Sequence, residues 1–325
     1  MSTMALGILF GLLAALCQSL CYVFSRAYVT RPGNRSSVLF GLSHVQMGVL
    51  ALALLPFCLL PVIRDVGTYA WPLLGAVTFY LIGQFCLFQA VKLTDASRVA
   101  PLLGLKILVL GFTAAFFLGR TVSSLQWGAI FLSVAAALAL NYSGGGGIPG
   151  KALLAVLGAC VGYSFSDLCI VAMTRSLAPH GEMRGILLAT ALSYMLTMPV
   201  GLALVAARAP EHRTPEKWKL AAPVALTWFA AMIFLFICFR NLDAVFGNIV
   251  QSLRGPISVL MGVILAAHGH VHLERKVGRW VLARRIGAAL LMCAAIGIFA
   301  HERSRMEKAR PAPEPSRAVQ SKEAI

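Results

Sequence analysis

The stretch Leu87–Lys106 (LFQAVKLTDASRVAPLLGLK) returns, at an offset of 148 residues, as Leu235–Arg254 (LFICFRNLDAVFGNIVQSLR). The positions that match in residue or in charge are Leu87 with Leu235, Phe88 with Phe236, Lys92 with Arg240, Asp95 with Asp243, Ala96 with Ala244, Leu105 with Leu253 and Lys106 with Arg254. A chain that repeats itself and places a cation at the same depth of each copy is typical of a membrane protein with internal two-fold symmetry. Its site is then expected where the two repeats meet.

The composition identifies an integral membrane protein. Of the 325 residues, 59% are hydrophobic and 12% are charged, whereas soluble domains carry about 25% charged residues. A helical span needs about 20 apolar residues. Ten such spans fit the sequence, at approximately 4–25, 37–61, 69–91, 96–118, 125–142, 151–174, 183–207, 219–239, 244–267 and 281–300.

The net charge of +16 would suggest nucleic acid as the partner of a soluble protein. Here most of the cations fall in loops and in the C-terminal tail, where the positive-inside bias and anionic lipid headgroups account for them. We therefore expect the lipid bilayer, and no nucleic acid, as the charged partner. The loop cations alone would place both termini outside, and the tail cations reduce that bias, so the charge distribution leaves the orientation open.

The spans divide evenly around a glycine-rich linker. We predict a first five-helix repeat at 1–143, a linker at 144–150, a second repeat at 151–301 and a charged, Pro-rich, disordered tail at 302–325. An odd number of spans makes the second copy cross the membrane in the opposite direction. The predicted fold is thus an all-α polytopic membrane protein with ten transmembrane helices arranged as two inverted five-helix repeats.

The two intramembrane cations are the main candidates for a site. A charge at the bilayer centre costs about 2.5–3.5 kcal/mol on insertion scales. Lys106 and Arg254 lie too deep in their spans to reach the interface easily. We interpret them as an anion site, with arginine as a planar fork and lysine as a point charge. The alternatives are a structural pair neutralised by an internal acid and wrongly drawn spans. Gly255-Pro256 should break the helix beside Arg254.

Other polar residues inside the spans extend this candidate site. Asp167 is the acid well inside a span, and it is either a proton-coupling carboxylate or the resting counter-ion of a cation. Gln251 and Asn248 share a helix face with Arg254 and are predicted to line the cavity and orient the substrate. Gln18 and Gln84 either line it or form interhelical hydrogen bonds worth about 0.6 kcal/mol. Four further aromatic residues could line the cavity, but we assign them to packing or to anchoring at the membrane interface, namely Tyr80, Tyr163, Tyr194 and Trp228.

The sequence gives no sign of an enzyme. It has no Ser-His-Asp constellation, P-loop or dinucleotide fingerprint, so we expect neither a cofactor nor coupling to ATP. The eight cysteines fall inside spans without metal-ligand spacing. His268, His270 and His272 alternate in a predicted loop, and we expect no metal there.

The organisation of residues 4–301 resembles the drug/metabolite transporter superfamily, and its EamA-like branch in particular. The junction Ala90–Ser97 with Pro101 is similar to that family's third-to-fourth span junction, and Gly247–Pro256 occupies the equivalent ninth-span position. One departure is Gly119-Arg120, where the family commonly has a glutamate. The resemblance implies a substrate path lined by spans three, four, eight and nine. It also implies both termini in the cytoplasm of a bacterial inner membrane.

We therefore predict a secondary transporter of a small anionic metabolite, such as an organic or sugar phosphate, a nucleotide sugar or a carboxylate. It would work by alternating access, with Lys106 and Arg254 binding the anion. Three alternatives stay open: an amino-acid or drug exporter with a structural basic pair, a flippase for an anionic lipid-linked sugar, and a non-transporting membrane scaffold. The sequence also leaves open coupling to a proton or to an exchanged anion, and whether the chain forms a homodimer.

Overall fold

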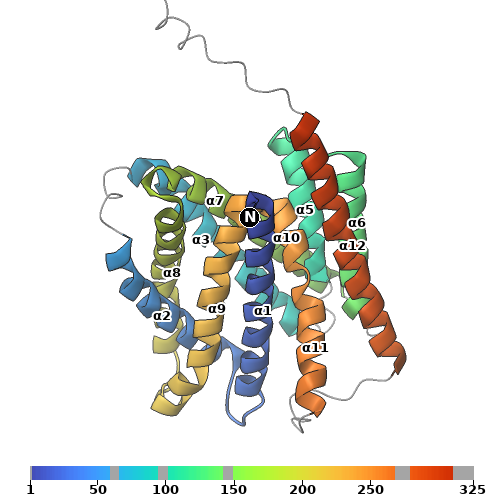
Figure 1. Cartoon of the computed structure of the whole chain (residues 1–325). Helices are drawn as coiled ribbons and strands as arrows, with labels where there is room; N and C mark the ends of the chain where they lie inside the picture. Colours follow the sequence, from blue (N-terminus) through green and yellow to red (C-terminus); the bar gives the residue numbers. More distant parts are fainter. Residues whose placement is uncertain (1, 59–65, 94–101, 142–148, 268–278, 310–325) are drawn as a thin grey trace, which may run out of the picture.

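The computed structural model describes residues 2–58, 66–93, 102–141, 149–267 and 279–309, and every regular element among them is a helix (Figure 1). The elements that build the fold are α1 (Thr3–Val29), α2 (Ser36–Leu54), α3 (Val66–Leu93), α5 (Lys106–Phe112), α6 (Ser124–Asn141), α7 (Gly150–Ser176), α8 (Glu182–Ala206), α9 (Pro215–Leu242), α10 (Ala244–Gln251), α11 (Arg254–Ala267) and α12 (Arg279–Ala309). Short helical turns η1 (Leu55–Phe57), η3 (Leu103–Leu105) and η4 (Thr113–Phe117) extend α2 and α5.

The chain is an all-α polytopic membrane protein, as predicted. Within the described ranges, seven helices are long and apolar enough to cross a membrane: α1, α2 with η1, α3, α7, α8, α9 and α12. Two shorter apolar helices, Leu103–Phe117 and Ser124–Ala139, correspond to the predicted fourth and fifth spans. The ninth span is divided into α10 and α11. Each of the ten predicted spans therefore corresponds to helix.

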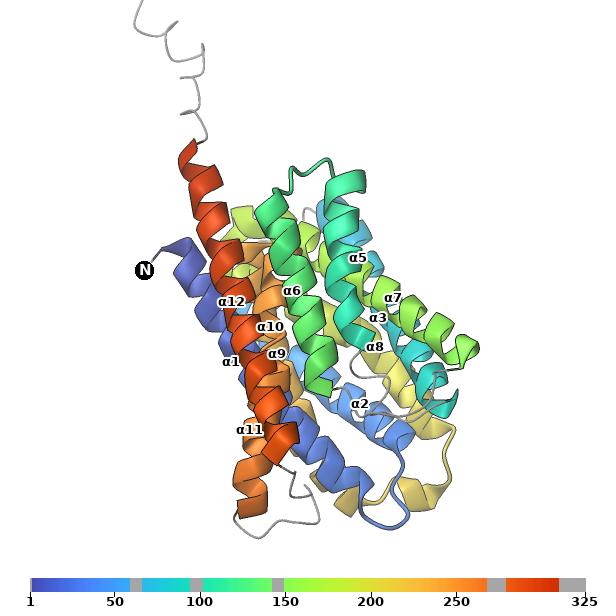
Figure 2. The ribbon, with the colours of Figure 1, turned by 90° about the vertical axis from the view of Figure 1, so that its right-hand side faces the viewer.

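The packing of these helices is two-fold symmetric. Helix α3 packs along α7, and α1 packs along α9; exchanging the two halves of the chain turns the first pair into the second. Helices α2 and α8 form one pair, and α6 and α12 another, and the same exchange maps each pair onto itself. Figures 1 and 2 show α6 and α12 side by side at one edge of the bundle. This pairing is the one expected of two repeats related by a two-fold axis, and that the repeats are inverted remains a prediction.

Small residues let the two repeats approach closely. A Cβ added at Gly162 of α7 would lie 2.8 Å from the backbone nitrogen of Gly83 on α3. Between α2 and α8, a Cβ added at Gly201 would lie 3.0 Å from the carbonyl oxygen of Gly41. Apolar side chains gain little from leaving lipid for protein, so backbone proximity of this kind is a main source of helix association in membranes.

Both cation-bearing spans are irregular beside their cations, and the irregularities fall in comparable places. The predicted break at Gly255-Pro256 lies earlier, between α10 and α11, and Arg254 is the first residue of α11. Pro256 fits the first turn of α11 because backbone nitrogens in the first turn of a helix donate to no intrahelical carbonyl. In the first repeat, η3 precedes α5, and Lys106 is the first residue of α5. Each cation therefore begins a new helical segment.

The last helix is longer than predicted. The sequence placed the end of the second repeat at 301, but α12 continues to Ala309. Arg303 explains the extension, since its Nη1 donates to the Leu242 carbonyl and lies 3.1 Å from Oδ2 of Asp243, at the junction of α9 and α10. Residues 144–148 of the predicted linker, the tail from 310 and the three clustered histidines lie outside the described residues, so those predictions remain predictions. Gly150, predicted as the end of the linker, is the first residue of α7.

Candidate functional site

A cavity of about 290 Å³ lies between the two repeats. Its walls come from both halves of the chain, with α1, α3, η3 and α5 from the first repeat and α7 to α11 from the second. The predicted site residues that line it are Gln18, Gln84, Lys106, Asp167, Gln251 and Arg254. Asn248 does not line the cavity, but its side chain forms a hydrogen bond with Asp167, which does.

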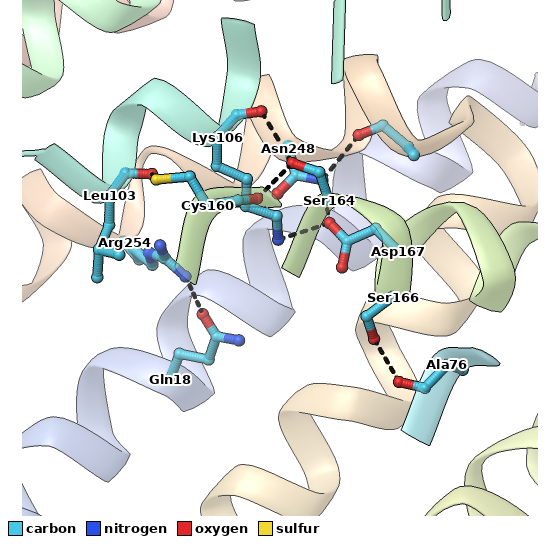
Figure 3. A network of polar contacts seen from close by, with 11 residues as sticks. Gln18, Ala76, Leu103, Lys106, Cys160, Ser164, Ser166, Asp167, Asn248 and Arg254 are labelled. Atoms are coloured by element: carbon cyan, nitrogen blue, oxygen red, sulfur yellow. Dashed lines mark hydrogen bonds and ion pairs between the residues drawn. The ribbon is translucent and has the colours of Figure 1, made fainter. Parts of the chain in front are cut away.

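Lys106 is neutralised by an acid of the opposite repeat. Its Nζ lies 2.6 Å from Oδ2 of Asp167 on α7, and the two side chains are 15% and 8% exposed (Figure 3). The amide nitrogen of Asn248 on α10 donates to the same oxygen at 2.6 Å and to the carbonyl of Ala244 at 2.8 Å. Ser164, also on α7, donates to the backbone carbonyl of Lys106 at 3.3 Å. The contribution of Asn248 to the site therefore passes through Asp167.

Arg254 is held differently, by neutral groups. Its Nη1 donates to Oε1 of Gln18 at 3.1 Å (Figure 3), and the hydroxyl of Ser19 donates to its backbone carbonyl at 3.0 Å. Among the described residues, no carboxylate forms an ion pair with Arg254. Among the described lining residues, one cation is thus compensated by Asp167 and the other is not, which gives them a net charge of one positive.

The supports of the two cations follow the internal symmetry but differ in charge. Helix α7 supports Lys106 and helix α1 supports Arg254, each through one side chain on the charged group and one serine on the backbone carbonyl. At the 148-residue offset, Asp167 of α7 corresponds to Ser19 of α1. Equivalent helices therefore support the two cations, but the equivalent positions carry different groups in different roles, and only one copy carries a carboxylate.

Aromatic residues form much of the remaining wall, and the sequence did not predict this. The cavity is lined by Tyr22, Tyr80, Tyr163, Tyr194 and Trp228. We had assigned four of these to packing, because periodicity alone cannot tell a wall of an internal cavity from a helix–helix contact. The Lys106 ammonium lies 5.8 Å from the centroid of the Tyr163 ring, within the range of a cation–π interaction. The indole N–H of Trp228 donates to the Tyr194 hydroxyl at 2.8 Å.

A buried histidine behind this wall was also missed. His44 of α2 is 3% exposed, and its Nδ1 lies 2.8 Å from the carbonyl oxygen of Phe40. A carbonyl only accepts, so Nδ1 carries the proton, and Nε2 accepts from the Tyr80 hydroxyl at 3.0 Å. The signal available in the sequence was a single imidazole inside an apolar span.

Two amides complete the polar end of the cavity. Gln251 is 3% exposed, and its Nε2 is buried without a hydrogen-bond partner. It precedes Arg254 by three residues and lines the same cavity. Gln84 lines the cavity from α3 and is half-buried. A buried donor without a partner costs about 1–3 kcal/mol, so a ligand that accepts a hydrogen bond at Gln251 would recover that cost.

Comparison with known proteins agrees with this architecture. Residues 5–142 match the model of the EamA-like transporter family. No curated protein matches the sequence. A solved structure described as "Crystal structure of protein" is similar to this chain with a TM-score of 0.67 and 16% sequence identity, and the similarity covers 93% of this chain and 98% of that chain. At this identity the similarity concerns the fold alone.

Proposed function

We propose that this chain, whose residues 5–142 match the EamA-like transporter family, carries a small organic anion across the membrane by alternating access. The observation that supports this proposal is the uncompensated charge of Arg254 in a cavity between the repeats. A buried cation without an acid is costly, and an anionic substrate would supply the missing partner. We further place the chain in a bacterial inner membrane with cytoplasmic termini.

The contacts suggest how binding is linked to the movement of the repeats. Without substrate, Asp167 holds Lys106 and Asn248, and it thereby joins α7 to α5 and α10. An anion bound at Arg254 can compete with Asp167 for Lys106, and Asp167 would then keep Asn248 as its donor. Because Lys106 and Arg254 belong to different repeats, an anion between them would bridge the halves. A ligand shifts a conformational equilibrium only through such contacts that differ between states.

The test is a thermal-shift panel on detergent-purified protein, with carboxylates, organic phosphates, nucleotide sugars, amino acids and cationic drugs. A ligand at 100 times its Kd adds about 2.7 kcal/mol of stability. We expect stabilisation by anions in the wild type and its loss in Lys106→Ala and Arg254→Ala. Lys151→Ala removes a charge from an exposed position at the start of α7 and should leave the response unchanged. An anion response that is absent, or equal in all variants, would contradict the proposal.

A second candidate, an exporter of lipophilic cations or amino acids, is favoured by the aromatic wall. Tyrosine and tryptophan ring faces attract cations, and the closed Lys106–Asp167 pair could be purely structural. Asp167→Asn separates the two candidates. Loss of the acid should preserve anion binding, because it releases Lys106, but it should abolish the binding of a cation that needs the carboxylate.

A further inference from the structure

The charge of the cavity limits the substrate to one negative charge. Among the described residues that line the cavity, Lys106 and Asp167 cancel, so Arg254 contributes the net charge. A phosphate monoester carries about 1.5 to 2 negative charges at neutral pH. In this cavity it would leave an excess anion in a low-dielectric site, where an unpaired charge is costly. A carboxylate matches the available charge.

The polar groups of the wall fit a carboxylate in chemistry as well as in charge. A guanidinium has five N–H donors, and one of those on Arg254 is used by Gln18. The buried Nε2 of Gln251 is a further unused donor in the same wall. A carboxylate has two oxygens that only accept, and it binds a guanidinium through two parallel hydrogen bonds.

The rest of the wall suits an apolar body rather than a polyhydroxylated one. Apolar and aromatic side chains dominate it, among them Leu87, Ile170, Met232 and Phe236. The polar ends of its aromatic residues are partly used, since the Tyr80 hydroxyl bonds His44 and the Trp228 N–H bonds Tyr194. Three hydroxyl side chains also line the cavity, but each already donates to a backbone carbonyl, namely Ser166, Ser193 and Thr197. Sugar hydroxyls would therefore lose water there without full replacement, and each unpaired polar group costs free energy.

An ammonium group on the substrate would also lack a free carboxylate among the described lining residues. Asp167 is the acid that lines the cavity in the described part of the chain, and Lys106 already neutralises it. The Tyr163 ring, which could attract a cation, already faces the Lys106 ammonium. A zwitterion would therefore bring a positive charge next to two resident cations.

We infer that the substrate is a monocarboxylate whose apolar body has about the size of one aromatic ring. It carries neither an ammonium group nor a second anionic group. This inference rests on the proposed function and narrows its substrate class. Arg254 holds the carboxylate, Gln251 donates to it, and the tyrosine and tryptophan faces contact the body.

Isothermal titration of the purified full-length chain with four matched probes tests the inference. 3-Phenylpropanoate has the predicted chemistry, 3-phenylpropanamide lacks its negative charge, and phenylalanine adds an ammonium group. Glucose 6-phosphate has a phosphate in place of the carboxylate and a sugar in place of the apolar body. We expect 3-phenylpropanoate to bind, the amide and phenylalanine to bind at least tenfold more weakly, and glucose 6-phosphate not to bind. The aliphatic 4-methylpentanoate should bind as well, because the wall recognises an apolar body and not an aromatic ring as such.

Variants assign the binding to Arg254. Arg254→Gln should weaken 3-phenylpropanoate binding at least tenfold. Arg254→Lys keeps the charge but loses the planar fork, so it should bind with intermediate affinity, and it serves as the test if Arg254→Gln does not fold. Arg305→Gln removes the same charge from a side chain that is 71% exposed at the end of α12, and its affinity should equal that of the wild type.

The outcomes separate this inference from the proposed function. Binding of glucose 6-phosphate that depends on Arg254 would leave an anion transporter standing and overturn the monocarboxylate inference. Phenylalanine binding as tight as 3-phenylpropanoate binding would overturn the exclusion of an ammonium group. If no anion binds, either in this titration or in the thermal-shift panel, both the inference and the proposed function are overturned.

Discussion

Ser19 and Asp167 occupy equivalent positions of the two repeats, yet they serve the paired cations in different ways. Asp167 lies 2.6 Å from the Lys106 ammonium, whereas Ser19 donates to the backbone carbonyl of Arg254 and leaves its guanidinium to neutral Gln18. The two equivalent positions thus differ in charge and in the group that they contact. An anion site needs this asymmetry, since a second carboxylate would have neutralised it.

Gln18→Glu should remove the charge of the site while keeping its shape. The new carboxylate would lie where Oε1 of Gln18 now accepts from Arg254 at 3.1 Å, and a charge-assisted pair would form. We expect anion affinity to fall at least tenfold and thermal stability to hold or rise. Isothermal titration and thermal unfolding measure the two quantities. Gln18→Met, which removes the acceptor without adding charge, should retain anion binding; equal losses in both variants would show that shape and not charge matters.

Breaking the buried ion pair from one side should be far more costly than removing it whole. Asp167→Asn leaves Lys106 charged and without its acid, and the loss of one partner of a buried pair costs about 3–5 kcal/mol. The double variant Lys106→Met with Asp167→Asn has no such charge, and it should be close to wild type in stability. Thermal unfolding of the two single variants and the double variant forms the cycle. Additive losses would mean that the pair is not coupled.

His44 and Tyr80 should behave as a coupled pair in stability. His44→Phe removes the acceptor of the Tyr80 hydroxyl, and a buried hydroxyl without a partner costs about 1–3 kcal/mol. Adding Tyr80→Phe removes that hydroxyl, so the double variant should recover much of the loss. Unfolding midpoints of the variants measure the coupling. A double variant that is less stable than either single variant would contradict the hydrogen bond.

Gly162→Ala should weaken the contact between α3 and α7. The added methyl group would lie 2.8 Å from the Gly83 nitrogen, and overpacking of this kind costs about 1–3 kcal/mol. Gly128→Ala on α6 is the matched control, because nothing lies within 4 Å of a Cβ there, and alanine favours helix. Thermal unfolding should therefore show a lower midpoint for Gly162→Ala and an unchanged or higher midpoint for Gly128→Ala. A neutral Gly162→Ala would mean that the repeats can separate slightly without loss.

The sequence alone determined the class of fold and the two central cations of the candidate site. Span length and composition require helices in a bilayer, and the offset that pairs Lys106 with Arg254 required two repeats. The odd number of spans in each repeat then required that they be inverted. These inferences depend only on local periodicity and on self-similarity, both of which can be read along one dimension.

Only the tertiary structure decided which partner each cation has. Asp167 could have paired with either cation, and its pairing with Lys106 follows from the packing of α7 against α5 rather than from any spacing in the chain. The aromatic wall and the contact between His44 and Tyr80 have the same origin, since they join α2, α3, α7, α8 and α9. Side chains that meet across helices leave no periodic signal in any one of them, so their contacts are set by how the repeats pack.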